Sequence, residues 1–437
     1  MFDAAVIGGG FKGMMTAYGL MQQGKSVCII EKGKQLGGFM SPMNWRGVDI
    51  DKGPQYLDGI NEAHKLILDN IMAEHEPLDS LEYSYGTFWN NRYTEGFALP
   101  DYRTLPKVDK AAVLYETLTQ NSATEKPYTI ADLYTDESEK SFSYIKRWCN
   151  KFLREDAENL SAINISFVTF FGRKLLLDNE LSVNLKQHPL IDNVLAASKV
   201  SVDHGTHNLY PLNKNLGYFR RSFEDKLQKS GVTSYMESEV SSIALINDSY
   251  AIDLAASDAV TAREIYCAAP IEITEKILLQ SSTIKQYTKP VAQLFYMLEI
   301  ELNKELPFYI MNYSSSSISR ITNFTAYGNK SSNGKSILCV EVPTTINSAE
   351  WNDPENHYAV LCDEINAMGL DANAIEAHQA FKVPATYRTV LRGYEQQLDI
   401  ISQKILKIYD DKVHILTPHL LTRASIMEDL TRRGILN

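Results

Sequence analysis

A glycine-rich turn near the start of the chain has the spacing of a dinucleotide-binding site. An apolar run over residues 4–7 leads into the sequence GGGFKG at residues 8–13, and apolar residues then recur at helical spacing. Gly8 would permit a tight turn, Gly10 a close approach of a pyrophosphate to the main chain, and Gly13 close packing of helix on strand. The N-terminus of the predicted helix would face the phosphates.

An acidic residue in the matching position accompanies this turn. A second apolar run, residues 27–30, ends at Glu31. A carboxylate at the end of the second strand of such a unit accepts hydrogen bonds from a ribose hydroxyl, and no arginine stands beside it to bind a 2′-phosphate. The sequence therefore predicts FAD or NAD in preference to NADP.

A second glycine pair and a Gly-Pro loop follow. Gly37 and Gly38 come shortly after Glu31, and DKGPQ occupies residues 51–55. An NAD dehydrogenase would proceed directly to another strand and helix. This layout resembles the flavoproteins that include amine oxidases, protoporphyrinogen oxidase, phytoene desaturase and UDP-galactopyranose mutase. The resemblance implies bound FAD, with the glycine pair along its pyrophosphate and ribityl chain and the Gly-Pro loop near the isoalloxazine ring.

Two later segments extend the resemblance. A Tyr-Pro and glycine block over residues 209–217 precedes a predicted helix, and a strand beginning at Val240 is similar to the one that contacts adenine in these flavoproteins. The residues expected at the cofactor are Gly8, Gly10, Phe11, Gly13, Glu31, Lys32, Gly37, Gly38, Phe39, Gly53, Pro54, Gln55, Val240 and Met427.

Within that group the layout is most similar to UDP-galactopyranose mutase. The similarity rests on residues 51–54, 319–324 and 426–429. It implies that Arg320 reaches substrate diphosphate and flavin and that Met427 caps the pyrimidine edge of the isoalloxazine. In the mutase, N5 of the reduced flavin attacks the anomeric carbon, and arginines carry the charge of the departing diphosphate. Arg173 and Arg388 are further candidates for that diphosphate.

The chain departs from the mutase at positions that matter for its chemistry. Two loop histidines of the mutase fall on Gln55 and Asp58, and a terminal Gly-Arg that supports the FAD pyrophosphate falls on residues 417–418, which are Thr-Pro. The tyrosines that follow it fall on Thr422 and Ala424. A proline supplies neither a cation nor a backbone donor. Arg423 is a candidate to replace the missing charge.

Three functions stay open on this basis. The first is an FAD-dependent oxidoreductase of the amine oxidase-like type that moves a hydride from a small polar substrate to flavin N5, with Arg320, Tyr56 and Asp58 as candidate catalytic residues and Tyr313 as a neighbour of the ring. The second is a mutase-like isomerase of a nucleotide sugar that uses reduced FAD as nucleophile. The third is a flavin-binding protein without catalysis.

Composition limits the classes of partner that are expected for this chain. The 437 residues carry a net charge of −11 without a basic block, so a small-molecule substrate is expected and nucleic acid is not. No apolar run has the length of a membrane span, and the start of the chain lacks a signal peptide's basic leader, which indicates the cytoplasm. A homo-oligomer stays open. The cysteines lack metal-ligand spacing and are expected to be reduced, at Cys28, Cys149, Cys267, Cys339 and Cys362.

The predicted fold is α/β, with a Rossmann-like FAD-binding domain interleaved with an α+β substrate domain made of a mixed sheet and a helical insertion. FAD-binding segments are expected at 1–80, 206–285 and 401–437, and substrate-domain segments at 81–205 and 286–400. Residues 107–198 and 348–408 are predicted to be mainly helical. Residues 81–99 and 290–342 are predicted to form strands, with a turn at Asn90 and Asn91.

Overall fold

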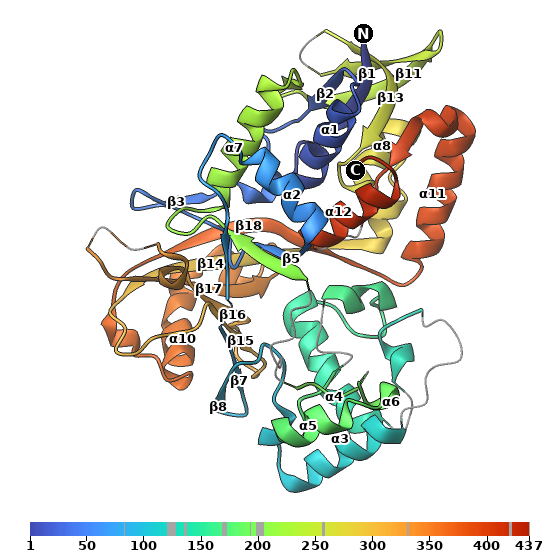
Figure 1. Cartoon of the computed structure of the whole chain (residues 1–437). Helices are drawn as coiled ribbons and strands as arrows, with labels where there is room; N and C mark the ends of the chain where they lie inside the picture. Colours follow the sequence, from blue (N-terminus) through green and yellow to red (C-terminus); the bar gives the residue numbers. More distant parts are fainter. Residues whose placement is uncertain are drawn as a thin grey trace. The chain divides into compact units, whose positions relative to one another are not determined.

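The computed structural model divides the chain into two compact units, each built from separate stretches of sequence (Figure 1). Unit 1 comprises Met1–Glu82, Asp203–Gln286 and Glu395–Asn437, and unit 2 comprises Tyr83–Val202 and Tyr287–Tyr394. The structure describes residues 1–82, 84–119, 128–134, 138–167, 173–192, 194–197, 205–255, 258–329, 331, 333–418 and 422–436. No helix in these ranges is both long and apolar enough to cross a membrane.

Unit 1 is organised around a seven-stranded sheet in which β1 lies at the centre and is fully paired on both sides. The strand order is β10-β2-β1-β13-β12-β11, and β19 also pairs with β13. The pairs among β10, β2, β1, β13 and β19 are parallel, whereas β11 and β12 form an antiparallel hairpin. The strands are β1 (Phe2–Ile7), β2 (Val27–Ile30), β10 (Thr233–Tyr235), β11 (Val240–Ile246), β12 (Ser249–Leu254), β13 (Val260–Cys267) and β19 (Val413–Ile415).

Helix α1 follows the glycine turn, as predicted, and occupies Phe11–Gln22. Both α7 and α12 pack against α1 (Figure 1). Because the helix follows a parallel strand and returns to its neighbour, β1, α1 and β2 form a right-handed crossover of the Rossmann type. The predicted fold class is confirmed. The other helices of unit 1 are α2 (Glu62–Ile71), α7 (Leu216–Lys229), α8 (Ile271–Leu279), α11 (Tyr394–Tyr409) and α12 (Arg423–Arg432).

Two small sheets complete unit 1. One pairs β3 (Met43–Trp45) with β4 (Val48–Ile50), and the other has the order β5-β9-β6. Its strands are β5 (Leu57–Asn61), β6 (Asp79–Ser80) and β9 (Thr206–Tyr210). The loop from β4 to β5 carries the Gly-Pro sequence, so these short strands hold that loop at both ends.

Unit 2 contains the second large sheet, in the order β18-β14-β17-β16-β15-β7-β8. One face carries apolar side chains such as Leu294, Leu338 and Val340, which pack with Leu361 and Ile365 of α10 (Pro354–Ala367). Side chains alternate along a strand, so Gln293 and Glu341 lie on the opposite face. The strands are β7 (Tyr85–Trp89), β8 (Arg92–Glu95), β14 (Thr288–Ile300), β15 (Tyr309–Asn312), β16 (Arg320–Asn323), β17 (Ser336–Thr344) and β18 (Ile375–Val390).

A helical region of unit 2 packs around an aromatic core. Trp89, Tyr102, Tyr144 and Trp148 contact one another with ring centroids 5.1 to 6.2 Å apart. Such edge and stacked contacts add to the burial of the rings and fix their positions. The helices of this region are α3 (Lys107–Thr119), α4 (Glu139–Trp148), a π-helical turn (Cys149–Leu153), α5 (Asn179–Leu185) and α6 (Pro189–Asp192). Helix α9 (Ala349–Asn352) lies elsewhere in unit 2 and contacts α10.

The predicted elements are confirmed in most places and wrong in one. Asn90 and Asn91 have φ of 52° and 56°, as a tight hairpin turn requires. The helical prediction for 348–408 holds for α10 and α11 but is wrong for 375–390, which form β18. Alanine, glutamate and glutamine in that segment favour helix, yet its pairing along nearly all of β14 outweighs that preference. Within 107–198, residues 120–127, 135–137, 168–172, 193 and 198 lie outside the described residues.

Candidate cofactor site

The three motif glycines serve different purposes. Gly8 has φ of +100°, and a Cβ on Gly13 would lie 1.9 Å from the carbonyl oxygen of Gly8, so both positions require glycine for the backbone itself. A Cβ on Gly10 would meet nothing within 4 Å. Gly10 is also the N-cap of α1, and no side chain in the described part of the chain caps that helix end. Its first-turn N–H groups are therefore suited to a phosphate.

Glu31 is oriented by the glycine turn that precedes it. The Gly9 N–H donates to Oε2 and the Gly33 N–H donates to Oε1, each at 2.7 Å. Each carboxylate oxygen retains a lone pair after this, so the side chain is held in place and can still accept from ribose hydroxyls. Lys32, which follows it, is exposed.

The second glycine pair lies directly against the first turn. The Gly37 N–H donates to the Gly9 carbonyl at 2.7 Å, and Gly10 and Gly37 form a parallel bridge. Both Gly37 and Gly38 have positive φ, 100° and 56°. The structure thus brings together two motifs that the sequence separates.

Arg220 of α7 covers this pair and is a residue that the sequence reading missed. A Cβ on Gly37 would lie 2.3 Å from the Arg220 Cγ. The guanidinium is buried and pairs with Glu224 at 2.6 Å, but its Nε has no hydrogen-bond partner among the described residues. A buried unpaired donor costs free energy unless a ligand or water accepts from it. No sequence motif marks an arginine in the middle of a helix as such a donor.

The buried carboxylate of Asp51 holds the Gly-Pro loop in place. Asp51 accepts from the Tyr210 hydroxyl at 2.7 Å and from the Leu216 N–H at the start of α7. Burial raises the pKa of Asp51 to about 6, against the opposing effect of these hydrogen bonds. Gly53 has φ of +72°, so the loop uses a left-handed glycine just before Pro54.

Arg423 joins this loop to α12 and to the start of α1. Its Nη1 donates to the Tyr56 carbonyl and its Nη2 to the Gln55 Oε1, both at 2.7 Å, and its guanidinium lies 5.9 Å from the centre of the Phe11 ring. The Gln55 amide in turn donates to the Phe39 carbonyl at 3.2 Å. The candidate replacement for the missing terminal arginine therefore lies among residues predicted at the cofactor.

The remaining predicted residues of unit 1 adjoin the same cluster. Met427 is fully buried on α12. Lys12, which is not among the predicted residues, donates to the Thr417 carbonyl at 3.0 Å. The pKa of Asp58 is raised chiefly by burial, against the attraction of Arg423. Val240 begins β11, and two residues earlier the Ser238 N–H donates to the Glu31 carbonyl at 3.0 Å. The expected adenine contact is thus placed beside the expected ribose acceptor.

Arg320 lies in unit 2 and is bound by a carboxylate of its own sheet. Its Nε and Nη2 donate to the two oxygens of buried Glu341, each at 2.8 Å. Gln293 donates to the same carboxylate at 2.6 Å. The charge of Arg320 is therefore neutralised within the protein. Arg173 pairs with Asp192 at 3.2 Å, and Arg388 lies on β18.

The cluster in unit 1 fits a dinucleotide. It offers open space at a helix N-terminus, an oriented carboxylate and a buried unpaired arginine nitrogen, which suit pyrophosphate and ribose. In the described ranges, no group of three His, Cys, Asp or Glu side chains could hold a metal ion.

Comparisons with known proteins bear on the same region and on the whole fold. Residues 6–71 match the family model of an NAD(P)-binding Rossmann-like domain. The (S)-6-hydroxynicotine oxidase of Paenarthrobacter nicotinovorans is 40% identical over 60 residues, which are 13% of this chain and 14% of that oxidase.

Two solved structures are similar over nearly the full length. A reduced UDP-galactopyranose mutase is 14% identical, with a TM-score of 0.70 over 95% of this chain and 88% of the mutase. Putrescine oxidase bound to putrescine is 13% identical, with a TM-score of 0.67 over 99% of this chain and 98% of the oxidase. The likeness therefore concerns the fold of both units.

Proposed function

Starting from its fold, which is that of the amine oxidase-like flavoproteins, we propose that this chain is an FAD-dependent oxidoreductase. It would act on a small polar molecule with a carbon that bears an amine or a hydroxyl group. Bound FAD would supply the hydride acceptor, and the electrons would pass on to dioxygen or another acceptor. The short match to (S)-6-hydroxynicotine oxidase and the likeness to putrescine oxidase support this class of reaction.

The observation that carries the proposal is the cradle of unit 1. The N-terminus of α1 at Gly10 would hold the pyrophosphate, and Glu31 would accept from the adenine ribose. Arg220 would direct its unpaired Nε to the cofactor. Gln55 and Arg423 would line the loop near the isoalloxazine ring, with Met427 as its expected neighbour.

The protein's part in the chemistry would be positioning and proton acceptance. Asp58 is the candidate proton acceptor, because its raised pKa makes it a better base than an ordinary aspartate. Tyr56 is the candidate that orients the substrate amine or hydroxyl. Arg320 would act indirectly. By pairing with Glu341 it would fix the surface of the unit 2 sheet that faces the substrate.

The ion pair between Arg320 and Glu341 argues against the mutase alternative. A mutase must hold a diphosphate that leaves and returns, which requires arginines whose charge is available. Arg320 gives both of its bonded nitrogens to Glu341, and Arg173 pairs with Asp192. The nucleotide-sugar reaction therefore has weaker support than the oxidation.

The test begins with the cofactor and a matched glycine variant. We expect the purified protein to be yellow and to release FAD on acid denaturation. Gly10→Ala should keep the fold, because the added Cβ meets open space and N-cap alanine costs about 1 kcal/mol or less. The variant should bind FAD at least tenfold more weakly, measured by flavin fluorescence titration.

The reaction is tested on the flavin-loaded protein without oxygen. Bleaching of the flavin band by one member of an amine and alcohol panel, with one oxidised product per flavin, would support the oxidoreductase. Turnover of a nucleotide sugar only after dithionite reduction, with equal substrate and product mass, would support the mutase instead. Bound FAD with neither reaction would indicate a flavin-binding protein without catalysis, and a colourless protein that takes up no FAD would rule out all three.

A further inference from the structure

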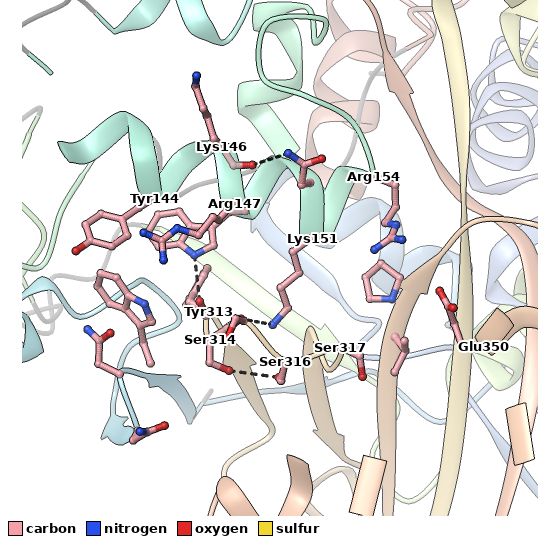
Figure 2. A pocket seen from close by; sticks show the side chains of 18 of the residues that line it. Tyr144, Lys146, Arg147, Lys151, Arg154, Tyr313, Ser314, Ser316, Ser317 and Glu350 are labelled. Atoms are coloured by element: carbon pink, nitrogen blue, oxygen red, sulfur yellow. Dashed lines mark hydrogen bonds between the residues drawn. The ribbon is translucent and has the colours of Figure 1, made fainter. Parts of the chain in front are cut away.

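All the residues that line a pocket of about 710 Å³ belong to unit 2 (Figure 2). It lies at the edge of the large sheet where β7 and β17 end and where the Ser314–Ser317 loop leaves β15. Arg320 and Glu341 are not part of its lining. The residues given a role in the proposed oxidation do not line this pocket, although Tyr313, which is expected near the flavin ring from the sequence, does.

One wall of the pocket is basic. Lys146, Arg147, Lys151 and Arg154 line it from α4, the π-helical turn and the residue after that turn. Arg147 belongs to α4, Lys151 to the π-helical turn that continues it, and Arg154, with φ of 55°, is the residue that ends this turn. Figure 2 shows Lys151 extending from the helical segment toward the serine loop, whereas Arg147 lies beside Tyr144 and Lys146 points away from the loop. Glu350 is the single acidic residue of the lining.

Three of these cations lack a close ion pair in the described part of the chain, although Glu364 attracts Lys151 and Glu350 attracts Arg154 from a greater distance. Lys146 pairs with Glu158 at 2.7 Å. Among the described residues, by contrast, Arg147, Lys151 and Arg154 make no ion pair within 4 Å. A cluster of cations without close ion pairs in a partly enclosed space attracts an anion. It stands out in a chain whose net charge is −11.

Lys151 is held in place by the opposite wall. Its Nζ donates to the carbonyls of Asn312 at 2.8 Å and Ser314 at 2.9 Å, which leaves one of its three N–H donors. Burial lowers the pKa of Lys151 to about 7, although Glu364 acts in the opposite direction. The withdrawal of this ammonium from water strengthens its interaction with any anion in the pocket.

The serine loop opposite the cations is fixed by two buried or half-buried groups. Asn312 accepts from the Ser314 N–H at 3.0 Å and donates to the Ser316 Oγ at 2.7 Å. Glu364 accepts from the Ser317 N–H at 2.7 Å and from its hydroxyl at 2.7 Å. The loop is therefore rigid before a ligand arrives, which reduces the entropy lost on binding.

Aromatic rings form another part of the lining. Trp148 donates from its indole nitrogen to the Tyr313 carbonyl at 3.2 Å, and the Tyr313 hydroxyl donates to the Ala98 carbonyl at 2.7 Å. These bonds hold the ring faces still. A pocket with fixed apolar walls and a few convergent charged groups is the usual form of a small-molecule site.

We propose that this pocket binds a small organic oxyanion, a phosphate ester or a carboxylate, whose anionic oxygens contact Arg147, Lys151 and Arg154. The organic part of the ligand would lie against Trp148 and Tyr313. The site belongs to unit 2 and does not depend on the flavin assignment.

The test uses the full chain in the presence of saturating FAD, which keeps the probes out of the unit 1 cradle. Inorganic pyrophosphate and citrate are titrated separately by calorimetry. We expect binding of at least one, weakened about tenfold by Arg147→Gln and by Arg154→Gln and more by the double variant. Tighter pyrophosphate would indicate a phosphate ester as the ligand, and tighter citrate a carboxylate.

Lys140→Gln is the matched control. It removes one positive charge from the same helix, but Lys140 pairs with Asp109 at 2.9 Å and does not line the pocket. Its binding should equal that of the unchanged protein. Hydrogen exchange gives a second measurement, in which the bound probe slows exchange in residues 146–154 and 313–317. Absence of binding at millimolar probe, or equal binding by the double variant, would overturn the proposal.

Discussion

The two charged residues that the sequence marks most strongly, Glu31 and Arg320, are bound by different kinds of group. Glu31 receives backbone N–H donors from Gly9 and Gly33, which hold the carboxylate in place. Arg320 faces a buried carboxylate, Glu341, which neutralises it. Residue type and position predict the surroundings of Glu31, because Gly9 belongs to the same local glycine motif and Gly33 lies two residues after Glu31. They predict the arginine poorly, because its partner lies on another strand.

Asp51 supplies a pH-dependent prediction at the same scale. Its pKa is raised from 3.8 to about 6, so between these values the folded protein binds more protons at this group than the unfolded chain does. The contribution of Asp51 to the free energy of unfolding must then decrease as the pH rises from about 4 to 6 and stay constant above. The decrease is about 3 kcal/mol, because one pKa unit corresponds to about 1.4 kcal/mol.

Urea unfolding of the protein and of Asp51→Asn from pH 4 to 7 measures this contribution as a difference. The asparagine keeps an oxygen that accepts from Tyr210 but does not titrate, so other groups cancel when the two curves are subtracted. The protein should lose stability relative to Asp51→Asn as the pH rises to 6. If the difference in the free energy of unfolding between the two proteins stays constant or increases with pH, the hydrogen bonds from Tyr210 and Leu216 outweigh burial.

At the scale of elements, the glycine turn predicts β1, α1 and β2 because the turn, the helix face and the buried strands are all local signals. The strand β18 shows the limit of such signals. Its residues include helix formers, and only the ladder with β14 makes it a strand. That pairing joins segments far apart in the sequence, so no local pattern carries it.

The candidate sites also divide into residues that a local sequence motif marks and residues that only packing between elements brings together. The glycines, Glu31 and the Gly-Pro loop are found from sequence because each is part of a motif. Arg220 and the basic pocket of unit 2 are not found from sequence. The place of Arg220 depends on where α7 crosses Gly37. The pocket depends on a turn of π-helix that meets a loop from another strand. Both depend on packing between elements.

The contact of α1 with β1 gives a prediction at the element scale. Gly13→Ala would place a Cβ 1.9 Å from the Gly8 carbonyl oxygen, so the helix must move away from the strand. We expect a loss of about 1 to 3 kcal/mol in the free energy of unfolding, despite the better helix propensity of alanine. Urea unfolding without FAD measures it. The matched variant Gly10→Ala should lose about 1 kcal/mol or less, and equal losses at the two positions would contradict the assigned roles.

At the scale of the whole molecule, the cofactor cluster draws on all three segments of unit 1. Gly10 and Glu31 belong to Met1–Glu82, Arg220 to Asp203–Gln286, and Arg423 to Glu395–Asn437. The chain passes through unit 2 between the first two segments and again between the last two. Assembly of the site therefore requires contacts between parts of the chain that are more than a hundred residues apart in sequence.

This organisation predicts that FAD stabilises the three segments of unit 1 together. A ligand that binds only the folded state lowers the unfolded population by a factor of one plus its concentration over its dissociation constant, about a hundredfold at a hundred dissociation constants. Amides that exchange only through cooperative unfolding of unit 1 should slow by that factor in all three segments, including β1, β13 and α12, measured by hydrogen exchange with mass spectrometry. Gly10→Ala at the same FAD concentration, with its binding weakened tenfold, should slow exchange only about tenfold. Slowing confined to residues 1–82 would show instead that the glycine turn binds the cofactor without help from α7 and α12.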